Sequence, residues 1–217
     1  MLAGEAVVAI WNGIVPERRD EFYAWHLHEH MPERVGIPGF RRGRRYMAVD
    51  AATHPEFFTL YEVDTFQVLQ GQDYANRLNA PTPWTTATTR FFRDTARALS
   101  RVLESSGPGM GAALLTLRFD ITEPAALRDL LRRIATAPRI CGAHLCAVDA
   151  EASGVQTVES RARTDLQAPP SWFAMIEATD PAALAVLDND AMAQAGASRI
   201  SRGVYALEYV RDKTSWG

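Results

Sequence analysis

The stretch SSGPGMG, residues 105–111, lies near the middle of the 217-residue chain. It consists almost wholly of Ser, Gly and Pro, which favour turns and interrupt helices and strands. The sequence on each side of this stretch shows the same order of strand and helix patterns. We therefore predict two units, residues 1–106 and 107–217, that repeat one fold.

The first unit opens with the apolar, strand-favouring run EAVVAIWNGI and continues from Pro16 as a charged and aromatic helical segment. The turn IPGF ends that helix, and two extended runs then flank the turn-forming stretch DAATHPE. The predicted elements are a strand at 5–14, a helix at 16–36, a hairpin of 41–49 with 57–64, a helix at 65–79, a short helix at 85–94 and a strand at 96–104.

The second unit repeats this order. Its predicted elements are strands at 111–120, 141–149, 171–180 and 202–211, with helices at 124–137 and 180–196 and a polar stretch of about 20 residues before the third strand. Each unit is thus a β-α-β-β-α-β pattern, which is typical of the ferredoxin-like α+β fold.

The packing of the two units follows from their sheets. A ferredoxin-like sheet carries helices on one face only and leaves the other face apolar. We expect the two sheets to pack face to face as an α+β barrel within one chain, which makes a monomeric pseudo-dimer. The alternative is two units side by side, each pairing with another chain in a homodimer.

Composition limits the class of protein. With 47% hydrophobic and 23% charged residues, the chain is typical of a soluble globular protein. No apolar run is long enough to span a bilayer, and residues 1–10 lack a signal peptide pattern, so we expect a cytoplasmic protein without membrane contact. The net charge of −3 argues against a nucleic-acid partner. Motifs for nucleotide binding and serine hydrolysis are absent.

The first unit holds four of the five histidines and three of the five tryptophans, so we expect the site there and a mainly structural second unit. On the first helix, His26, Glu29 and His30 fall on the apolar arc, whereas His28 points away. The spacing of His26 and His30 can bind a metal, but no third ligand is evident and we expect none. Either histidine can instead act as a general acid or base, or pack as a core residue that caps a carbonyl.

These residues also carry a family resemblance. The run Trp25-His26-Leu27-His28-Glu29-His30-Met31-Pro32-Glu33-Arg34 and the later motifs IPGF, RRY, YE and PTPW resemble the EthD-like branch of the dimeric α+β barrel superfamily over most of residues 5–104. The resemblance implies a ferredoxin-like fold with a ligand pocket between helices and sheet. Members include lactone isomerases, polyketide cyclases, cofactor-free monooxygenases, dehydratases and haem-degrading enzymes, so no single reaction is implied.

Candidate roles follow from residue type. We expect His30 to be the general acid or base, with Glu29 or Asn12 orienting it, His26 beside it, and Tyr61 and Tyr46 as hydroxyl donors. The expected substrate-binding residues are Asn12, Trp25, Tyr46, Trp84 and Arg90. Trp84 would form a lid over the pocket and Arg90 would contact an anion. Alternatively, Trp84 fills the gap between helix and sheet and Arg90 forms an ion pair at the surface.

Strand register decides which of these side chains meet. Tyr61 and Glu62 point to opposite faces, and if Tyr61 faces His30, a buried Glu62 needs an arginine such as Arg45 or Arg101. The faces of Asn12 and Tyr46 remain open to a one-residue shift of register.

The expected function is cofactor-independent proton-transfer chemistry, of isomerase, cyclase, dehydratase or monooxygenase type, on a small apolar cyclic or aromatic metabolite. The alternative is a non-catalytic module that binds a hydrophobic ligand or haem. A third possibility is a related fold that has lost its chemistry.

Overall fold

The computed structural model describes residues 1–163 and 165–214. Its strands are β1 (Ala6–Ile14), β2 (Phe40–Ala48), β3 (Phe57–Val63), β4 (Phe92–Ser106), β5 (Ala113–Asp120), β6 (Ile140–Val148), β7 (Trp172–Ala178) and β8 (Ser198–Asp212). Its α-helices are α1 (Arg19–Trp25), α2 (Met31–Gly36), α3 (Phe66–Gln70), α4 (Gln72–Asn79), α5 (Pro83–Thr89), α6 (Ala125–Ile134), α7 (Ala150–Gly154), α8 (Val158–Arg161) and α9 (Asn189–Gln194). Segments of 3-10 helix lie at Pro16–Arg18 and Pro181–Val186, and a π-helical turn lies at His26–His30.

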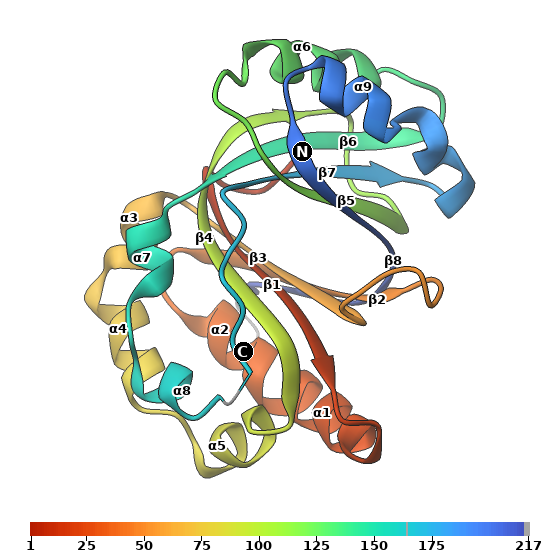
Figure 1. Ribbon diagram of the computed structural model, residues 1–217. Helices are drawn as coiled ribbons and strands as arrows, with labels where there is room; N and C mark the ends of the chain where they lie inside the picture. The colour runs from red at the N-terminus through yellow and green to blue at the C-terminus, as the bar shows by residue number, and fades with distance from the viewer. Residues whose placement is uncertain (164, 215–217) are drawn as a thin grey trace.

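The strands close into one barrel in the order β1-β3-β2-β8-β5-β7-β6-β4, and the helices lie outside it (Figure 1). All neighbouring strands are antiparallel. Because β2 pairs with β8 and β4 pairs with β6, sheet hydrogen bonds join the two halves of the chain on both sides. The predicted α+β fold, two β-α-β-β-α-β runs forming an intrachain barrel, is confirmed, and the side-by-side arrangement is excluded.

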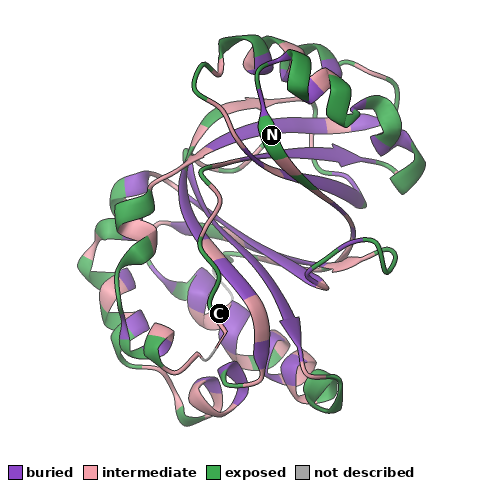
Figure 2. Cartoon of the chain, in the orientation of Figure 1, coloured by how far each residue is buried: buried purple, intermediate pink, exposed green. Residues whose placement is uncertain are grey.

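Side chains from both halves fill the barrel. On β1, Val7, Ala9 and Trp11 belong to the interior cluster, whereas Val8 and Ile10 face the helices. The Trp11 ring lies 5.0 Å from Phe58 and 5.3 Å from Phe173, measured between ring centroids, so it contacts both halves. Strands β1 and β3 are buried along their whole length (Figure 2), because they face both the barrel interior and a helix layer, whereas β8 is mostly half-buried or exposed.

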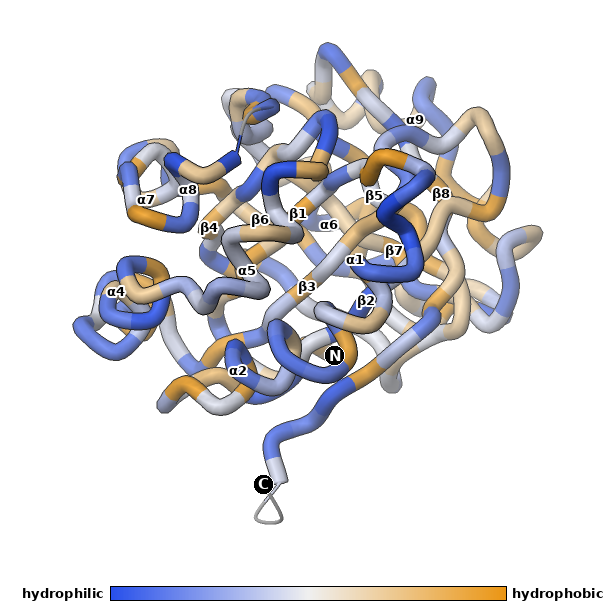
Figure 3. The backbone as a smooth tube through the Cα atoms, turned by 90° about the horizontal axis from the view of Figure 1, so that it is seen from below, coloured by the Kyte–Doolittle hydropathy of each residue, from blue (hydrophilic) through white to orange (hydrophobic). Residues whose placement is uncertain are grey.

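The outer helices present polar residues to solvent. Figure 3 shows hydrophilic residues along α1 and α4, on the outside of the barrel. Within residues 1–163 and 165–214, no helix has the length and apolar character needed to cross a bilayer.

Several predicted boundaries are wrong for physical reasons. The helix predicted at 65–79 breaks at Gly71 into α3 and α4, and the one at 180–196 breaks where Asp188 caps α9 by accepting the Ala191 N–H at 2.8 Å. The helix predicted at 85–94 ends at Thr89. Strand β4 then starts at Phe92, before the predicted 96, because pairing with β1 extends it through charged positions.

The polar stretch of the second half crosses to the first half. We call residues 149–163 and 165–167 the covering segment; it contains α7 and α8, which lie beside α4 (Figure 1). Its backbone meets β4 beyond the end of β6: Asp149 donates to the Leu99 carbonyl at 2.9 Å, and Gln167 donates to the Thr95 carbonyl at 2.7 Å. The covering segment therefore caps a strand edge that would otherwise carry unpaired groups.

Candidate functional site

The first helical segment runs through residues 16–36, as predicted, but contains a π-helical turn that the sequence did not indicate. The Met31 N–H donates to the His26 carbonyl, five residues earlier. Such turns are frequent at functional sites. The turn holds Trp25, His26 and His30 against the sheet with exposed fractions of 0%, 3% and 3%, and it leaves His28 exposed, as the helical arc predicts.

His30 lies between two aromatic side chains. Its ring centroid is 4.2 Å from Trp25 and 6.4 Å from Tyr61 on β3. The His30 Nδ1 atom and the Tyr61 hydroxyl are both buried without a hydrogen-bond partner. Buried polar atoms are almost always paired, because leaving one unpaired costs about 1–3 kcal/mol. Two such unpaired atoms on neighbouring side chains make this place a candidate for binding a polar ligand.

His30 is neutral at pH 7. Burial lowers its pKa well below the ordinary 6.5, and the positive charge of Arg34 lowers it further. A neutral imidazole has one ring nitrogen that can accept a proton. The lowered pKa therefore favours the base over the acid among the roles expected for His30.

His26 has a different partner. Its Nδ1 atom lies 3.4 Å from Nη1 of Arg45, which also pairs with Glu208 at 3.0 Å. Because a guanidinium only donates, Nδ1 accepts and the imidazole is neutral. Burial, followed by the charges of Arg45 and Arg34, lowers the pKa of His26 well below 6.5. His26 is thus held by a partner, whereas His30 is not.

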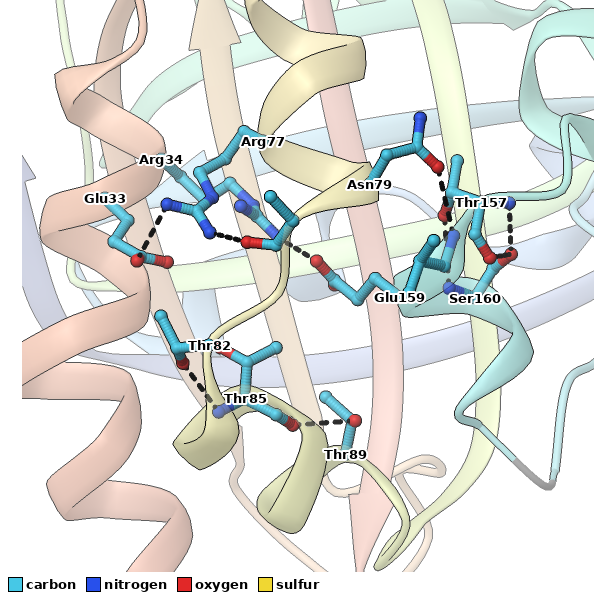
Figure 4. Close-up of polar contacts among 12 residues, drawn as sticks. Glu33, Arg34, Arg77, Asn79, Thr82, Thr85, Thr89, Thr157, Glu159 and Ser160 are labelled. Atoms are coloured by element: carbon cyan, nitrogen blue, oxygen red, sulfur yellow. Dashed lines mark hydrogen bonds and ion pairs between the residues drawn. The ribbon is translucent and has the colours of Figure 1, made fainter.

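A buried ionic cluster lies near His30, and two of its charges, on Arg34 and Arg163, lower the pKa of His30. Arg34 on α2 pairs with Glu159 on α8 (Figure 4). Glu159 also accepts from Arg163 at 2.9 Å. These three side chains are 5%, 5% and 6% exposed. Burial alone would raise the pKa of Glu159, but the two guanidiniums hold it below its ordinary value.

Glu159 and Arg163 were not predicted, because they lie in the polar stretch of the second half. Their spacing of four residues and the capping box of Thr157 with Ser160 do indicate a helical turn. Nothing in the sequence indicates which unit that turn covers. The site that residues 1–106 were expected to hold therefore includes a contribution from the covering segment.

Glu29 does not orient His30. Its carboxylate accepts from the hydroxyls of Thr82 at 2.6 Å and Thr85 at 3.3 Å, which ties the start of α5 to the π-helical turn. Thr85 also accepts from the indole N–H of Trp25 at 3.1 Å. Glu29 thus positions α5 beside the site.

The other predicted residues are spread around the site. Tyr46 lies inside the barrel, where its hydroxyl accepts from Arg44 at 2.7 Å, so the sheet separates it from His30. Asn12 is buried, and its amide donates to the Gly13 carbonyl at 3.3 Å. Trp84 packs partly buried against the cluster around Phe22, as a plug would, and Arg90 is exposed.

The predicted partners of Glu62 are wrong. Glu62 points away from Tyr61 into the barrel, as predicted, but its partners there are Arg42 at 2.7 Å and Arg44 at 2.9 Å. Strand alternation sends Arg45 to the helix side with His26, and Arg101 pairs with Asp149 at 3.7 Å.

Two adjoining cavities lie beside the ionic cluster. The larger, about 320 Å³, is lined by α3, α4, β4 and the covering segment, and includes Tyr74. The smaller, about 170 Å³, is lined by Glu159, Arg163 and parts of β4. Both share Arg97 and Val155. Neither is lined by a histidine, so neither offers an axial imidazole to haem.

In the second half of the chain, apolar side chains fill the space between the helices and the sheet. There the helix–sheet interface is an apolar cluster in which Leu127 and Leu131 of α6 pack with residues such as Leu115 and Leu117 of β5. In the part of the chain that the structure describes, no group of three His, Cys, Asp or Glu side chains is placed to hold a metal ion.

No family model and no curated protein matches the sequence. Solved structures do match: a candidate monooxygenase from Fusobacterium nucleatum (TM-score 0.59, 7% identity, covering 98% of this chain and 96% of that one) and an anthrone oxidase-like protein (TM-score 0.58, 9% identity, covering 95% and 92%). A candidate monooxygenase from Lactobacillus acidophilus has a TM-score of 0.52 at 9% identity and covers 96% of each chain. At such low identity the likeness shows the fold alone, which is the ferredoxin-like, dimeric α+β barrel type.

Proposed function

We propose that this protein is a cofactor-independent oxygenase that acts on a small cyclic or aromatic substrate, with His30 as the base. The observation that carries the proposal is the buried, neutral His30 with an unpaired Nδ1 atom beside the unpaired hydroxyl of Tyr61. The names of the similar structures, monooxygenase and anthrone oxidase-like, support oxygen chemistry over other proton transfers. We include in this proposal membership of the EthD-like branch, which the motifs over most of residues 5–104 resemble.

The chemistry begins with an acidic CH₂ group next to a carbonyl or an aromatic ring. His30 Nδ1 accepts one proton, and the resulting carbanion gives its electrons to O₂ while a C–O bond forms. The peroxide takes the proton back from His30 and loses water, so that R₂CH₂ + O₂ becomes R₂C=O + H₂O. No metal or organic cofactor is needed when the substrate itself supplies the electrons.

Two further side chains support this step. The Tyr61 hydroxyl is positioned to donate to the enolate oxygen, and it stays protonated because burial raises its pKa above the ordinary 10. The buried charge of Arg34 favours an anion beside His30.

Access requires movement. The larger cavity reaches Tyr74, whose ring lies 5.4 Å from Phe40, and the Phe40 ring lies 6.1 Å from Tyr61. This aromatic wall stands between the cavity and His30. A reacting carbon must come within hydrogen-bond reach of Nδ1, so binding displaces part of the wall or of the covering segment.

The test is oxygen uptake by the purified protein with anthrone, together with the appearance of anthraquinone. We expect one O₂ consumed per ketone formed, no effect of EDTA, and a loss in kcat of about 10²- to 10⁴-fold in His30→Ala. His28→Ala is the matched control on the same helical segment and should keep full activity, because His28 is exposed.

Full activity of His30→Ala would contradict the proposal. His30-dependent turnover of such substrates without oxygen uptake would point instead to an isomerase, cyclase or dehydratase. A Soret band on adding haem that His30→Ala abolishes, without turnover, would favour the haem-binding alternative.

Because the barrel closes within one chain, we further propose a monomer, which light scattering can test.

A further inference from the structure

Arg97 is a cationic side chain placed at both cavities of the site. It lies on β4 opposite Ile10 of β1 and lines the larger cavity together with Leu99. Within residues 1–163 and 165–214 its guanidinium makes no hydrogen bond or ion pair, and its Nε atom is buried without a partner. A guanidinium carries five N–H donors, so an unpaired one beside a cavity is poised for a ligand that accepts.

The carboxylates around the cavities are engaged elsewhere or exposed. Glu159 is shared by Arg34 and Arg163. Asp149 caps α7 by accepting the Ala152 N–H at 3.0 Å and pairs with Arg101 at 3.7 Å. Glu151 is exposed. Among the described residues, no carboxylate lies within ion-pair distance of Arg97, although Asp149 and Glu151 line the same cavity.

The charge of Arg97 acts on Arg163. Burial lowers the pKa of Arg163, the Glu159 carboxylate opposes that shift, and the positive charge of Arg97 adds to it. A negative group bound at Arg97 would reduce the repulsion between Arg97 and Arg163 and accept from the unpaired donor of Arg97.

The rest of the larger cavity suits a ring. Its apolar lining includes Leu69, Tyr74, Leu78 and Leu99, and its volume of about 320 Å³ is within the range of small-molecule sites. An aromatic ring and aliphatic side chains in the same cavity as an arginine are complementary to a compound with an apolar ring and one acidic group.

We propose that this cavity binds a small aromatic or alicyclic carboxylic acid, with the ring against Tyr74 and Leu78 and the carboxylate on Arg97. The inference rests on the proposed function in one respect, that the ligand is the substrate of His30. Arg97 would then select acids over neutral compounds of the same shape.

The test is calorimetric binding of two matched pairs, benzoate with benzamide and 1-naphthoate with 1-naphthamide, at pH 7 and low salt. We expect the protein to bind at least one acid about ten-fold or more tightly than its amide, since charge-assisted hydrogen bonds to arginine are strong. Arg97→Gln should abolish that preference, and Arg97→Lys should keep part of it because it keeps the charge.

Arg93→Gln is the matched control. Arg93 lies on the same strand, lines neither cavity and donates to the Phe92 carbonyl at 2.8 Å, so its loss removes an equal charge without touching the proposed site. It should keep the preference for the acid. Thermal unfolding of each variant confirms that it is folded.

The outcomes separate this inference from the proposed function. Equal binding of acid and amide in both pairs, or an acid preference that survives Arg97→Gln, would overturn the inference. Arg97-dependent acid binding that persists in His30→Ala, in a protein that oxidises nothing, would uphold the inference and refute the oxygenase. Oxidation of anthrone that depends on His30, with no acid preference, would do the reverse.

Discussion

Arg44 on β2 and Glu177 on β7 form an ion pair inside the barrel, with Nη1 and Oε2 2.8 Å apart. Each side chain is 1% exposed, and 133 residues separate the two in sequence. Arg44 also lies 2.9 Å from Glu62. One guanidinium thus contacts carboxylates from both halves of the chain, and Arg42 adds a second positive charge at Glu62. Strand alternation alone would leave the two acids facing an apolar interior.

Replacing Arg44 by Met should destabilise the fold by about 3–5 kcal/mol, because it leaves Glu62 and Glu177 buried with weaker compensation. Urea unfolding followed by circular dichroism measures the change. Arg41→Met is the control: its partner Asp64 is at the surface, and exposed pairs contribute about 1 kcal/mol at most. Equal losses of unfolding free energy in the two variants would mean that the buried Arg44 pair contributes no more to stability than an exposed pair.

Acid should weaken the fold through the buried His26 and His30. Burial lowers the pKa of both His26 and His30 in the folded state, so the unfolded chain binds protons first as the pH falls below about 6.5. Their contribution to stability is complete above that pH and is lost as the pH drops toward the lowered pKa values. Each histidine adds a slope of up to about 1.4 kcal/mol per pH unit.

Urea unfolding between pH 7.5 and 5.5 tests this slope. His30→Gln should remove the part of the slope that one histidine contributes, up to about 1.4 kcal/mol per pH unit. His28→Gln, at an exposed position, should leave the slope unchanged. A slope that is the same in the protein and in His30→Gln would contradict the lowered pKa of His30.

A glycine allows α2 to approach the sheet. A Cβ atom added at Gly43 of β2 would lie 2.0 Å from the sulfur of Met31 and 3.1 Å from the Tyr61 ring. Gly43→Ala should therefore cost about 1–3 kcal/mol through overpacking and disturb the position of Tyr61. Gly36→Ala, where no atom lies within 4 Å of the added Cβ, should change stability by less than about 1 kcal/mol in either direction.

The fold could be predicted because its signals are local. The turn-rich stretch at 105–111 and the two repeats of strand and helix patterns lead directly to paired ferredoxin-like units. Period-two alternation likewise sends Tyr61 and Glu62 to opposite faces, as the structure has them. Element ends were less predictable, because Gly71 and Asp188 interrupt helices whose apolar pattern continues.

The site could be predicted only in part. The helical arc places His26 and His30 on the buried face, but the π-helical turn and the separate partners of the two histidines depend on tertiary contacts. The face of the sheet on which Tyr46 lies depends on the register of β2, which a single sequence leaves open. The role of Glu159 could not be predicted, because its pairing with Arg34 joins segments 125 residues apart in the sequence.

The covering segment should open when its central ion pair is lost. Glu159→Gln leaves the buried Arg34 and Arg163 without a counter-charge, so the closed state loses its compensation while the barrel keeps its own contacts. A loss of about 1.4 kcal/mol or more in local stability raises the open population at least about ten-fold. Trypsin should then cleave after Arg161 and Arg163 at a correspondingly higher rate. Glu151→Gln, at an exposed position on α7, should leave cleavage unchanged, and an unchanged rate in Glu159→Gln would mean that the backbone bonds to β4, not Glu159, hold the segment closed.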